Sequence, residues 1–526
     1  MKQSIQKWAS RIWPVLVCVI CLAISVGTYA AYGMHNLDSD ISSEFVLAQL
    51  LNEEGRVFLT DSWFYSTELR IVAPVPVYQL ALTLFSDWHM ARTFSIAVLL
   101  VGVVLSMVYM LRGVGASVKS ALLCAATVIL PITQYNSFTL VYGGFYTVCV
   151  MLTFIEIGLV TRLGKSRGLR MVLQAFALCA LSLYGGLNGV RMMMICNAPL
   201  IAACLITFYL EVKDCESVRK MLSLSSFRLL CAGLVCAAAA YIGYVINTNV
   251  FAYAYDFQQY GETVIAPLSA QMFTDQIIAL MSYFGYRNYA ALLSLEGIVS
   301  LLAVVLPVAG FAAIILLLRM KLEARERLLA VFSIVALLLG MVLNVLTLDK
   351  NSGLPYTVSY YMPAAILLVY ALFWVFDRFA CRHAFLRTLP MLALVGVFLA
   401  GNSVYRDKEF NQYPTELEEI AECLLDEAAY EGYATFWNAN VLTEITSGEL
   451  EAFSVEEWEY GTINPWLQRK DHLDREPWGR VFALYRAQDW KEGEPGYDSD
   501  RLVYASDSFY VVVYESDEEF REAIGW

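Results

Sequence analysis

The sequence predicts an all-α polytopic membrane bundle of about 11 spans, with a long first outer loop of surface helices and a small C-terminal α/β domain outside the membrane. Of the 526 residues, 58% are hydrophobic and only 16% are charged. Long apolar segments recur up to about residue 403, whereas the remainder is acidic and polar. Such an apolar share cannot be buried in one soluble globule, and it excludes a disordered chain or a disulfide scaffold.

Eleven apolar segments are long enough to cross a hydrocarbon core, which takes about 20 residues. They are residues 12–33, 93–111, 120–137, 144–161, 171–187, 192–210, 227–247, 297–318, 328–347, 360–377 and 388–403. Residues 1–403 are therefore expected to form the membrane domain. Two long outer loops are expected within it, over residues 34–92 and 248–296.

Basic residues orient these segments. Lys2, Lys7 and Arg11 precede the first span, and 20 basic residues fall on that side of the membrane against 6 on the other before residue 403. The positive-inside rule therefore places the N-terminus in the cytoplasm. We interpret the first segment as an uncleaved anchor rather than a signal peptide. An odd number of spans then places the C-terminal region outside.

One apolar segment is too short to count as a span. Residues 71–86 contain Pro74 and Pro76 near their beginning. A crossing here would move most of the inner basic residues to the outer side, against the positive-inside rule. We therefore interpret this segment as an interfacial or re-entrant helix on the outer face.

The net charge of −13 divides into two opposite parts. Residues 403–526 hold 10 Lys+Arg and 29 Asp+Glu, whereas the preceding residues carry a net +6. This acidic region argues against binding of nucleic acid. The stretches YATFW, LEAFSV, VFALYRA and LVYASDSFYVVVYES predict strands and TELEEIAECLLDEAA a helix, so residues 404–526 are expected to form a small α/β domain. Four of its tryptophans, Trp437, Trp458, Trp466 and Trp478, could stack on sugars, but we expect core packing.

An acidic pair begins the first outer loop. Asp38 and Asp40 follow the first span, and alternate residues of an extended segment point the same way. Two such carboxylates can bind a divalent cation, or one can act as a general base. Glu44 lies one turn after Asp40 on a helix expected to begin near Ile41 and to end at Gly55. In the simpler interpretation, Asp40 is only the N-cap of that helix.

Two arginines are candidate anion contacts on the outer side. Arg92, in WHMARTFS, is a lone cation where the second span begins, and Arg191 ends the glycine-rich turn YGGLNGVR. Glycines allow close approach of the backbone to a ligand, and the guanidinium fork matches phosphate oxygens. The alternative is that both side chains reach to lipid headgroups.

These motifs resemble the C-type glycosyltransferases of the inner or plasma membrane, the group that includes the protein mannosyltransferases and the aminoarabinose transferase of lipid A. Asp38-Ser39-Asp40 stands at the family's acidic position, and PVPVYQLALTLFSDWHMARTFS resembles its Pro-Pro-Leu-Tyr-Tyr stretch followed by Ala-Arg-Leu-Pro-Ser. SYYMPAAILLVYAL resembles its Arg-Tyr-Leu-Leu-Pro segment, but Ser359 stands where the family has an arginine. The turn NSFTLVYGG also lacks an Asp that many members carry.

The resemblance implies transfer of a sugar from a polyprenyl-phosphate donor to a glycan, lipid or protein acceptor. The reaction would take place at the outer face of a plasma membrane, in a protein that is bacterial by this resemblance. Asp40 is then expected to be the base, with Asp38 as second choice or as its partner in binding a divalent cation such as Mg²⁺ or Mn²⁺. The expected substrate contacts are Glu44, Arg92, Arg191 and Tyr360.

Two other functions are compatible with the sequence. One is a transporter or flippase for a lipid-linked glycan or another envelope component, and the other is a non-catalytic membrane protein of envelope assembly. Transporters usually carry several acids within the membrane, whereas Glu156 is the one clear case here. A glycosyltransferase is therefore the preferred interpretation.

Overall fold

The computed structural model describes residues 2–526 except 68, 143, 214, 216, 258–268, 347–357, 379–383, 457, 459–461, 493 and 495–496. Contacts within the chain divide it into two compact units. The first comprises Met1–Thr28, Ile96–Phe251 and Tyr260–Phe410, and the second comprises Tyr29–Ser95, Ala252–Gln259 and Asn411–Trp526. The whole of the predicted first outer loop, residues 34–92, thus groups with the C-terminal region.

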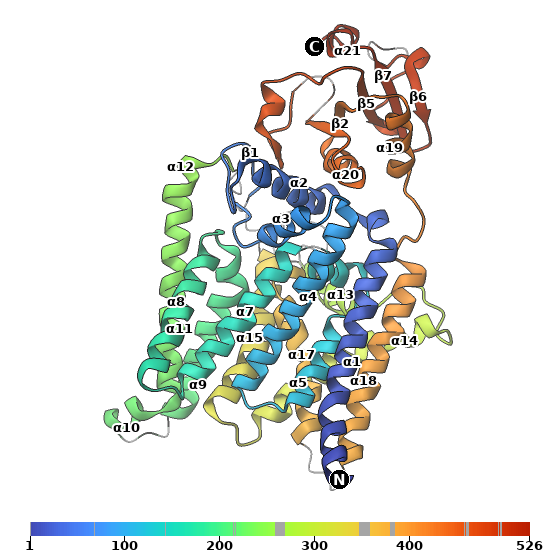
Figure 1. Ribbon diagram of the computed structural model, residues 1–526. Helices are drawn as coiled ribbons and strands as arrows, with labels where there is room; N and C mark the ends of the chain where they lie inside the picture. The colour runs from blue at the N-terminus through green and yellow to red at the C-terminus, as the bar shows by residue number, and fades with distance from the viewer. Residues whose placement is uncertain are drawn as a thin grey trace. The chain divides into compact units, whose positions relative to one another are not determined.

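Helices make up the first unit (Figure 1). In the described part of the chain, nine helices are long and apolar enough to cross a membrane, and they coincide with nine of the eleven expected segments. They comprise α1 (Lys2–Tyr32), α4 (Trp88–Gly113), α7 (Gly144–Leu163), α8 (Gly168–Gly186), η3 (Met193–Asn197) with α9 (Ala198–Val212), α11 (Ser225–Ile246) with η4 (Asn247–Phe251) and α12 (Ala252–Ala254), α14 (Leu295–Leu318), α15 (Ala324–Leu346) and α18 (Ala384–Lys408). The prediction of a polytopic helical bundle is confirmed.

The other two expected spans differ in form. α17 (Met362–Arg378) has 17 residues, which is at the lower limit for a crossing helix. The segment 120–137 is not one continuous helix, because α5 (Val118–Val128) has 11 residues and is followed by α6 (Gln134–Asn136) and the π-helical η2 (Ser137–Val141). Pro131 explains the break, since proline lacks an N–H and restricts the residue before it.

Two glycines bring α8 and α11 into backbone contact. A Cβ atom on Gly186 would lie 2.0 Å from the carbonyl oxygen of Ala240, and one on Gly243 would lie 2.2 Å from that of Leu183. Small residues allow this approach, which is common between membrane helices. Gly186 therefore serves helix packing, whereas Gly189, with φ of 91°, forms the turn before Arg191.

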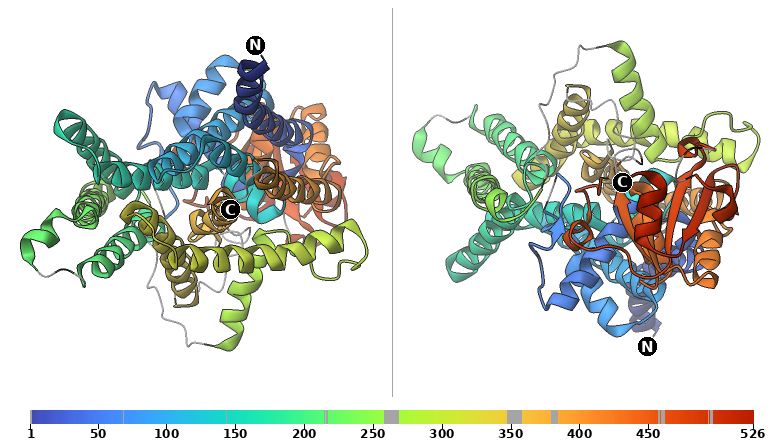
Figure 2. Two further views of the ribbon diagram at one scale, coloured as in Figure 1. Left: turned by 90° about the horizontal axis from the view of Figure 1, so that it is seen from below. Right: turned by 90° about the horizontal axis from the view of Figure 1, so that it is seen from above.

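The C-terminal part of the second unit is built on a five-stranded sheet, whose strands are seen side by side in the right view of Figure 2. In the order β3-β2-β5-β7-β6, the strands are β3 (Glu451–Val455), β2 (Glu431–Thr435), β5 (Val481–Arg486), β7 (Phe509–Tyr514) and β6 (Leu502–Ala505). β2 pairs in parallel with β3 and with β5, whereas β7 runs antiparallel to both of its neighbours, β5 and β6. α19 (Glu416–Asp426) and α20 (Phe436–Ile445) cover one face, and α21 (Asp517–Ile524) covers the other.

The tryptophans of this region divide between core and surface. Trp458 is buried in the core beside Tyr485, as expected. Trp437 and Trp478 are 53% and 80% exposed, so the expectation of core packing is wrong for these two. Trp437 occupies the second position of α20 and Trp478 a connection before β5, where the sheet does not cover them.

The first outer loop contributes η1 (Met34–Asn36), α2 (Ser39–Glu54), β1 (Trp63–Phe64) and α3 (Val75–Leu84) to the second unit. α3 is a short apolar helix of 10 residues that begins after Pro74, in line with the interfacial interpretation. β1 pairs antiparallel with β4 (Gln468–Arg469), which joins this loop to the C-terminal region. The remaining elements are α10 (Val218–Ser223), α13 (Ala270–Tyr283), η5 (Lys470–Leu473), η6 (Ala487–Asp489) and η7 (Ser499–Arg501).

Candidate functional site

The acidic pair lies at the beginning of α2. Asp38 has extended backbone angles, φ −132° and ψ 167°, and its Oδ1 accepts a hydrogen bond of 2.9 Å from the N–H of Ile41. Asp38 is therefore the N-cap, and the interpretation that gave this role to Asp40 is wrong. Asp40 lies in the first turn instead, where the partial positive charge of the helix N-terminus favours a carboxylate.

Asp38 has an unusual protonation equilibrium. Burial and the neighbouring carboxylate of Asp40 raise its pKa to about 7, although the N–H of Ile41 and the cation of Arg92 act in the opposite direction. A carboxyl group with this pKa gains or loses its proton near neutral pH, which is the range in which acid and base catalysts work best. The negative charge of the pair therefore changes with pH around 7.

Glu44 is buried one turn further along α2. Its side chain is 2% exposed, and its Oε1 lies 3.4 Å from Nη1 of Arg70, which is 8% exposed. Arg70 has a left-handed φ of 58°, which non-glycine residues rarely adopt. The sequence does not single out Arg70, because it stands between a polar loop and an apolar segment like an ordinary boundary residue. The structure thus places Glu44 beside a cation near the acidic pair.

Arg92 is not the lone cation that the sequence suggests. It is fully buried at the beginning of α4, and its Nε and Nη2 donate hydrogen bonds to the carboxylate of Glu444 on α20, with Nη2 2.7 Å from Oε2. Nη2 also donates to the carbonyl oxygen of Ile41 at 3.2 Å. The guanidinium carbon lies 4.4 Å from the ring centre of Phe45 and 5.2 Å from that of Tyr78. Lipid headgroups are therefore not its partners.

Arg191 and Tyr360 come together in the first unit, although they belong to different motifs. The guanidinium carbon of Arg191 lies 5.3 Å from the ring centre of Tyr360 and 5.1 Å from that of Tyr146. Its Nη1 lies 3.4 Å from Oγ of Ser359, the residue that stands at the family's arginine position. The side chain is largely buried, and the cation–π geometry fixes its guanidinium between two tyrosines.

Glu156 lies inside the bundle in a hydrogen-bonded site of its own. Its Oε2 accepts from Nδ2 of Asn197 at 3.0 Å, and the thiols of Cys196 and Cys236 lie 3.3 and 3.1 Å away. A buried carboxyl group needs such partners in a membrane. These contacts account for Glu156 as a local link between α7, η3 and α11.

The protein offers few side chains that could bind a metal ion. Within the described ranges, no group of three or more His, Cys, Asp or Glu side chains is arranged to hold a metal ion. Mg²⁺ often takes only one or two carboxylates together with phosphate oxygens of the substrate. Asp38 and Asp40 fit that smaller set, so a cation here would depend on the phosphate of a bound donor.

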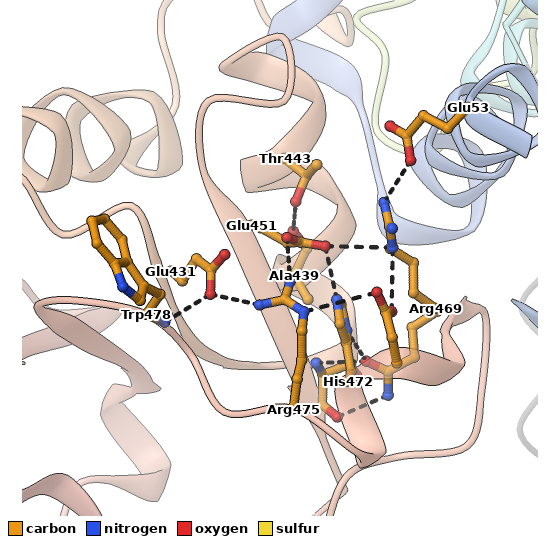
Figure 3. A network of polar contacts seen from close by, with 12 residues as sticks. Glu53, Glu431, Ala439, Thr443, Glu451, Arg469, His472, Arg475 and Trp478 are labelled. Carbon is orange, nitrogen blue, oxygen red and sulfur yellow. Dashed lines mark hydrogen bonds and ion pairs between the residues drawn. The ribbon is translucent and has the colours of Figure 1, made fainter. Parts of the chain in front are cut away.

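A second polar cluster, which the sequence does not indicate, lies at the beginning of β2 and β3 (Figure 3). Oε1 of Glu451 lies 2.9 Å from Nε2 of His472, and Arg475 pairs with both Glu451 and Glu431. Burial acts to raise the pKa of Glu451, but His472, Arg475 and Arg469 outweigh it and lower the pKa to about 2. Arg469 also pairs with Glu53 of α2 at 3.0 Å. The cluster thereby ties the end of α2 to the sheet.

Comparison with solved structures identifies a shared fold. ArnT from Cupriavidus metallidurans, in crystal structures bound to undecaprenyl phosphate and in the apo state, matches with TM-scores of 0.55 and 0.54 at 12% identity. The matches cover 95% and 96% of this chain and 98% of ArnT. An Archaeoglobus fulgidus oligosaccharyltransferase structure, with Zn and sulfate, matches with a TM-score of 0.47 at 14% identity over 83% of this chain and 62% of that one. The sequence matches no family model and no curated protein. The chain thus has the fold of ArnT along almost its whole length, as the resemblance implied.

Proposed function

We propose that this multi-pass membrane protein is a C-type glycosyltransferase that moves a sugar from a polyprenyl-phosphate donor to an acceptor hydroxyl. The observation that carries the proposal is the acidic pair at the beginning of α2, in which Asp38 has a pKa of about 7. The shared fold supports it, because ArnT has been crystallised with undecaprenyl phosphate. The motifs of the first outer loop support it independently of the fold.

In the proposed reaction, Asp40 accepts the proton of the acceptor hydroxyl. The hydroxyl oxygen then forms a bond to the anomeric carbon while the bond from that carbon to the phosphate oxygen breaks. Polyprenyl phosphate leaves with the electron pair, and the configuration at the anomeric carbon is inverted. An ionised Asp38 beside Asp40 keeps the pair negative.

The leaving phosphate needs positive charge around it. We assign this role to Arg191, with Tyr360 holding its guanidinium in place. Arg92 is enclosed by Glu444 and two aromatic rings, so it is better suited to act on α2 than on the donor. A divalent cation held by the acidic pair would supply further positive charge to the phosphate.

The proposed orientation follows from the basic loops. The N-terminus lies in the cytoplasm, and the acidic pair and the C-terminal domain lie outside a plasma membrane. The donor's lipid would then enter between spans, with its phosphate at the outer face. The acceptor, whether a glycan, a lipid or a protein, would approach from the outer side.

The test is sugar transfer in membranes supplied with labelled polyprenyl-phosphate sugar. We expect Asp40→Asn to reduce transfer by about 100-fold or more, because general base catalysis contributes at least that much. Asp38→Asn should fold normally, since Asn is also a good N-cap, and should reduce transfer by removing the neighbouring charge.

Asp87→Asn is the matched control. Asp87 is exposed and caps α4 in the same manner, with its Oδ1 3.2 Å from the N–H of Met90. It should leave transfer unchanged. Transfer at the wild-type rate in both Asp38→Asn and Asp40→Asn would exclude the catalytic assignment and favour a transporter or an assembly protein.

A further inference from the structure

We propose that Glu444 is a positioning residue for the acidic pair. It would act through Arg92 and the first turn of α2, and its catalytic consequence rests on the proposed function. Glu444 lies on α20, in the C-terminal region, and touches neither Asp38 nor Asp40 among the described contacts. The C-terminal domain would thereby set the geometry of a site in the first outer loop.

Four hydrogen bonds connect Glu444 to the pair. The Glu444 carboxylate accepts from Nε and Nη2 of Arg92, and the same Nη2 donates to the carbonyl oxygen of Ile41. The N–H of Ile41 in turn donates to Oδ1 of Asp38. The carbonyl oxygen of Ile41 therefore accepts a hydrogen bond from Arg92, which Glu444 holds in place. The N–H of Ile41 donates to Asp38, which Glu444 would orient through this connection.

Burial makes this connection rigid. The side chains of Arg92 and Glu444 are both 0% exposed, so water does not compete for their hydrogen bonds. The planar guanidinium presents its donors in fixed directions, and the rings of Phe45 and Tyr78 limit its movement. α20 also packs along α2, whose Ile41 and Phe45 are fully buried. The position of the first turn of α2 is thus determined by α20.

A double variant separates positioning from stability. Replacing both members of a buried ion pair by apolar residues is often neutral or stabilising, whereas removing one leaves an uncompensated charge. Arg92→Met/Glu444→Leu should therefore fold, while it lacks the bond to Ile41. Glu444→Asp is the second variant, because it keeps the charge but withdraws the carboxylate by one methylene group. Glu418→Gln is the control, since Glu418 pairs with His35 and does not touch α2.

The first measurement is hydrogen exchange at the N–H of Ile41. In the double variant and in Glu444→Asp, we expect this exchange to be at least about tenfold faster than in the wild type. In Glu418→Gln it should be unchanged. Unchanged exchange in a folded double variant would overturn the proposal. This measurement does not depend on any enzymatic activity, so it tests the positioning role even if the wild-type protein transfers no sugar. Absence of transfer by the wild-type protein would exclude the proposed function but not the positioning role.

The second measurement is steady-state transfer. Displacement of a catalytic group by about 1 Å can reduce a rate by about 100-fold. We expect kcat of the folded double variant to fall at least about tenfold, with the donor KM unchanged. A rise in KM at unchanged kcat would instead make Arg92 a donor contact, and wild-type kcat with wild-type KM would make the pair purely structural; either result overturns the proposal.

Discussion

Arg92 shows how a residue's role depends on a partner far away in the sequence. Its sequence neighbours are apolar or small, so it stands out as an isolated cation at the outer end of a span. Glu444, 352 residues later, occupies a short helix with no motif around it. A buried ion pair of this kind contributes little net stability when complete, but removal of one partner typically costs about 3–5 kcal/mol. A sequence pattern can therefore single out Arg92, but it does not reveal that Glu444 is its partner.

Asp38 carries a pH prediction. Its pKa of about 7 means that Asp38 takes up a proton, and the acidic pair loses negative charge, as the pH falls through 7. We therefore expect kcat/KM for transfer to fall as the pH is lowered through about 7. Because this pKa lies above the usual 3.8, ionisation of Asp38 also destabilises the folded protein as the pH rises from about 4 to 7. The measurement is kcat/KM from pH 5 to 9, and a value that stays constant down to pH 5 would contradict the prediction.

Much of the acidic site could be predicted from residue types alone. Asp38, Asp40 and Glu44 were identified from their spacing, and the structure places all three at the beginning of α2. The cap assignment was wrong because both Asp38 and Asp40 are good N-caps, and only the backbone angles decide between them. Arg70 and Glu444 could not be predicted, because their contacts depend on how loops and domains pack. The periodicity of the local sequence does not reveal such contacts.

At the scale of elements, α2 is held at both of its ends. Asp38 caps its beginning, Gly55 ends it with a left-handed φ of 65°, and Arg469 pairs with Glu53 in its last turn. Ile41, Phe45, Ala48 and Leu51 recur at helical spacing along it, and all four are buried. The helix was predictable because periodicity, cap and stop signal agree. The break after α5 was harder to predict, because an average hydropathy over the whole apolar segment hides the effect of Pro131.

The contact between α8 and α11 gives a prediction for one element pair. Gly243→Ala would place a methyl group 2.2 Å from the carbonyl oxygen of Leu183, which forces the two backbones apart. We expect a loss of about 1–3 kcal/mol, the usual cost of overpacking, measured as a lower melting temperature in detergent. Gly396→Ala in α18 is the control, because a Cβ there meets no atom within 4 Å. An equal melting temperature for both variants would show that the close approach is unimportant.

At the scale of the whole molecule, composition and basic loops were sufficient for the fold class. Apolar length defines spans because every backbone polar group must be satisfied inside the membrane, a constraint that needs no tertiary information. The same reasoning predicts the strands and helices of residues 404–526 from alternation and turn residues. It does not predict that Tyr29–Ser95 and Asn411–Trp526 form one compact unit, because their contacts join distant segments.

The orientation of the whole chain is also testable. With the N-terminus inside and an odd number of crossings, alkaline phosphatase fused after Trp526 should be active, because it folds only outside the cytoplasm. Green fluorescent protein fused after Arg167, in the loop between α7 and α8, should be fluorescent. The reverse result at either position would contradict the assignment of the basic loops to the cytoplasm.

The pairing of Arg92 with Glu444 also has a consequence for how the protein is made. At about 5–20 residues per second, roughly 20–70 s separate the synthesis of the two residues. During that time Arg92 stands at the head of a membrane helix without its carboxylate, and the fold of the first outer loop waits for the last part of the chain. A chain released before α20 never acquires the missing charge.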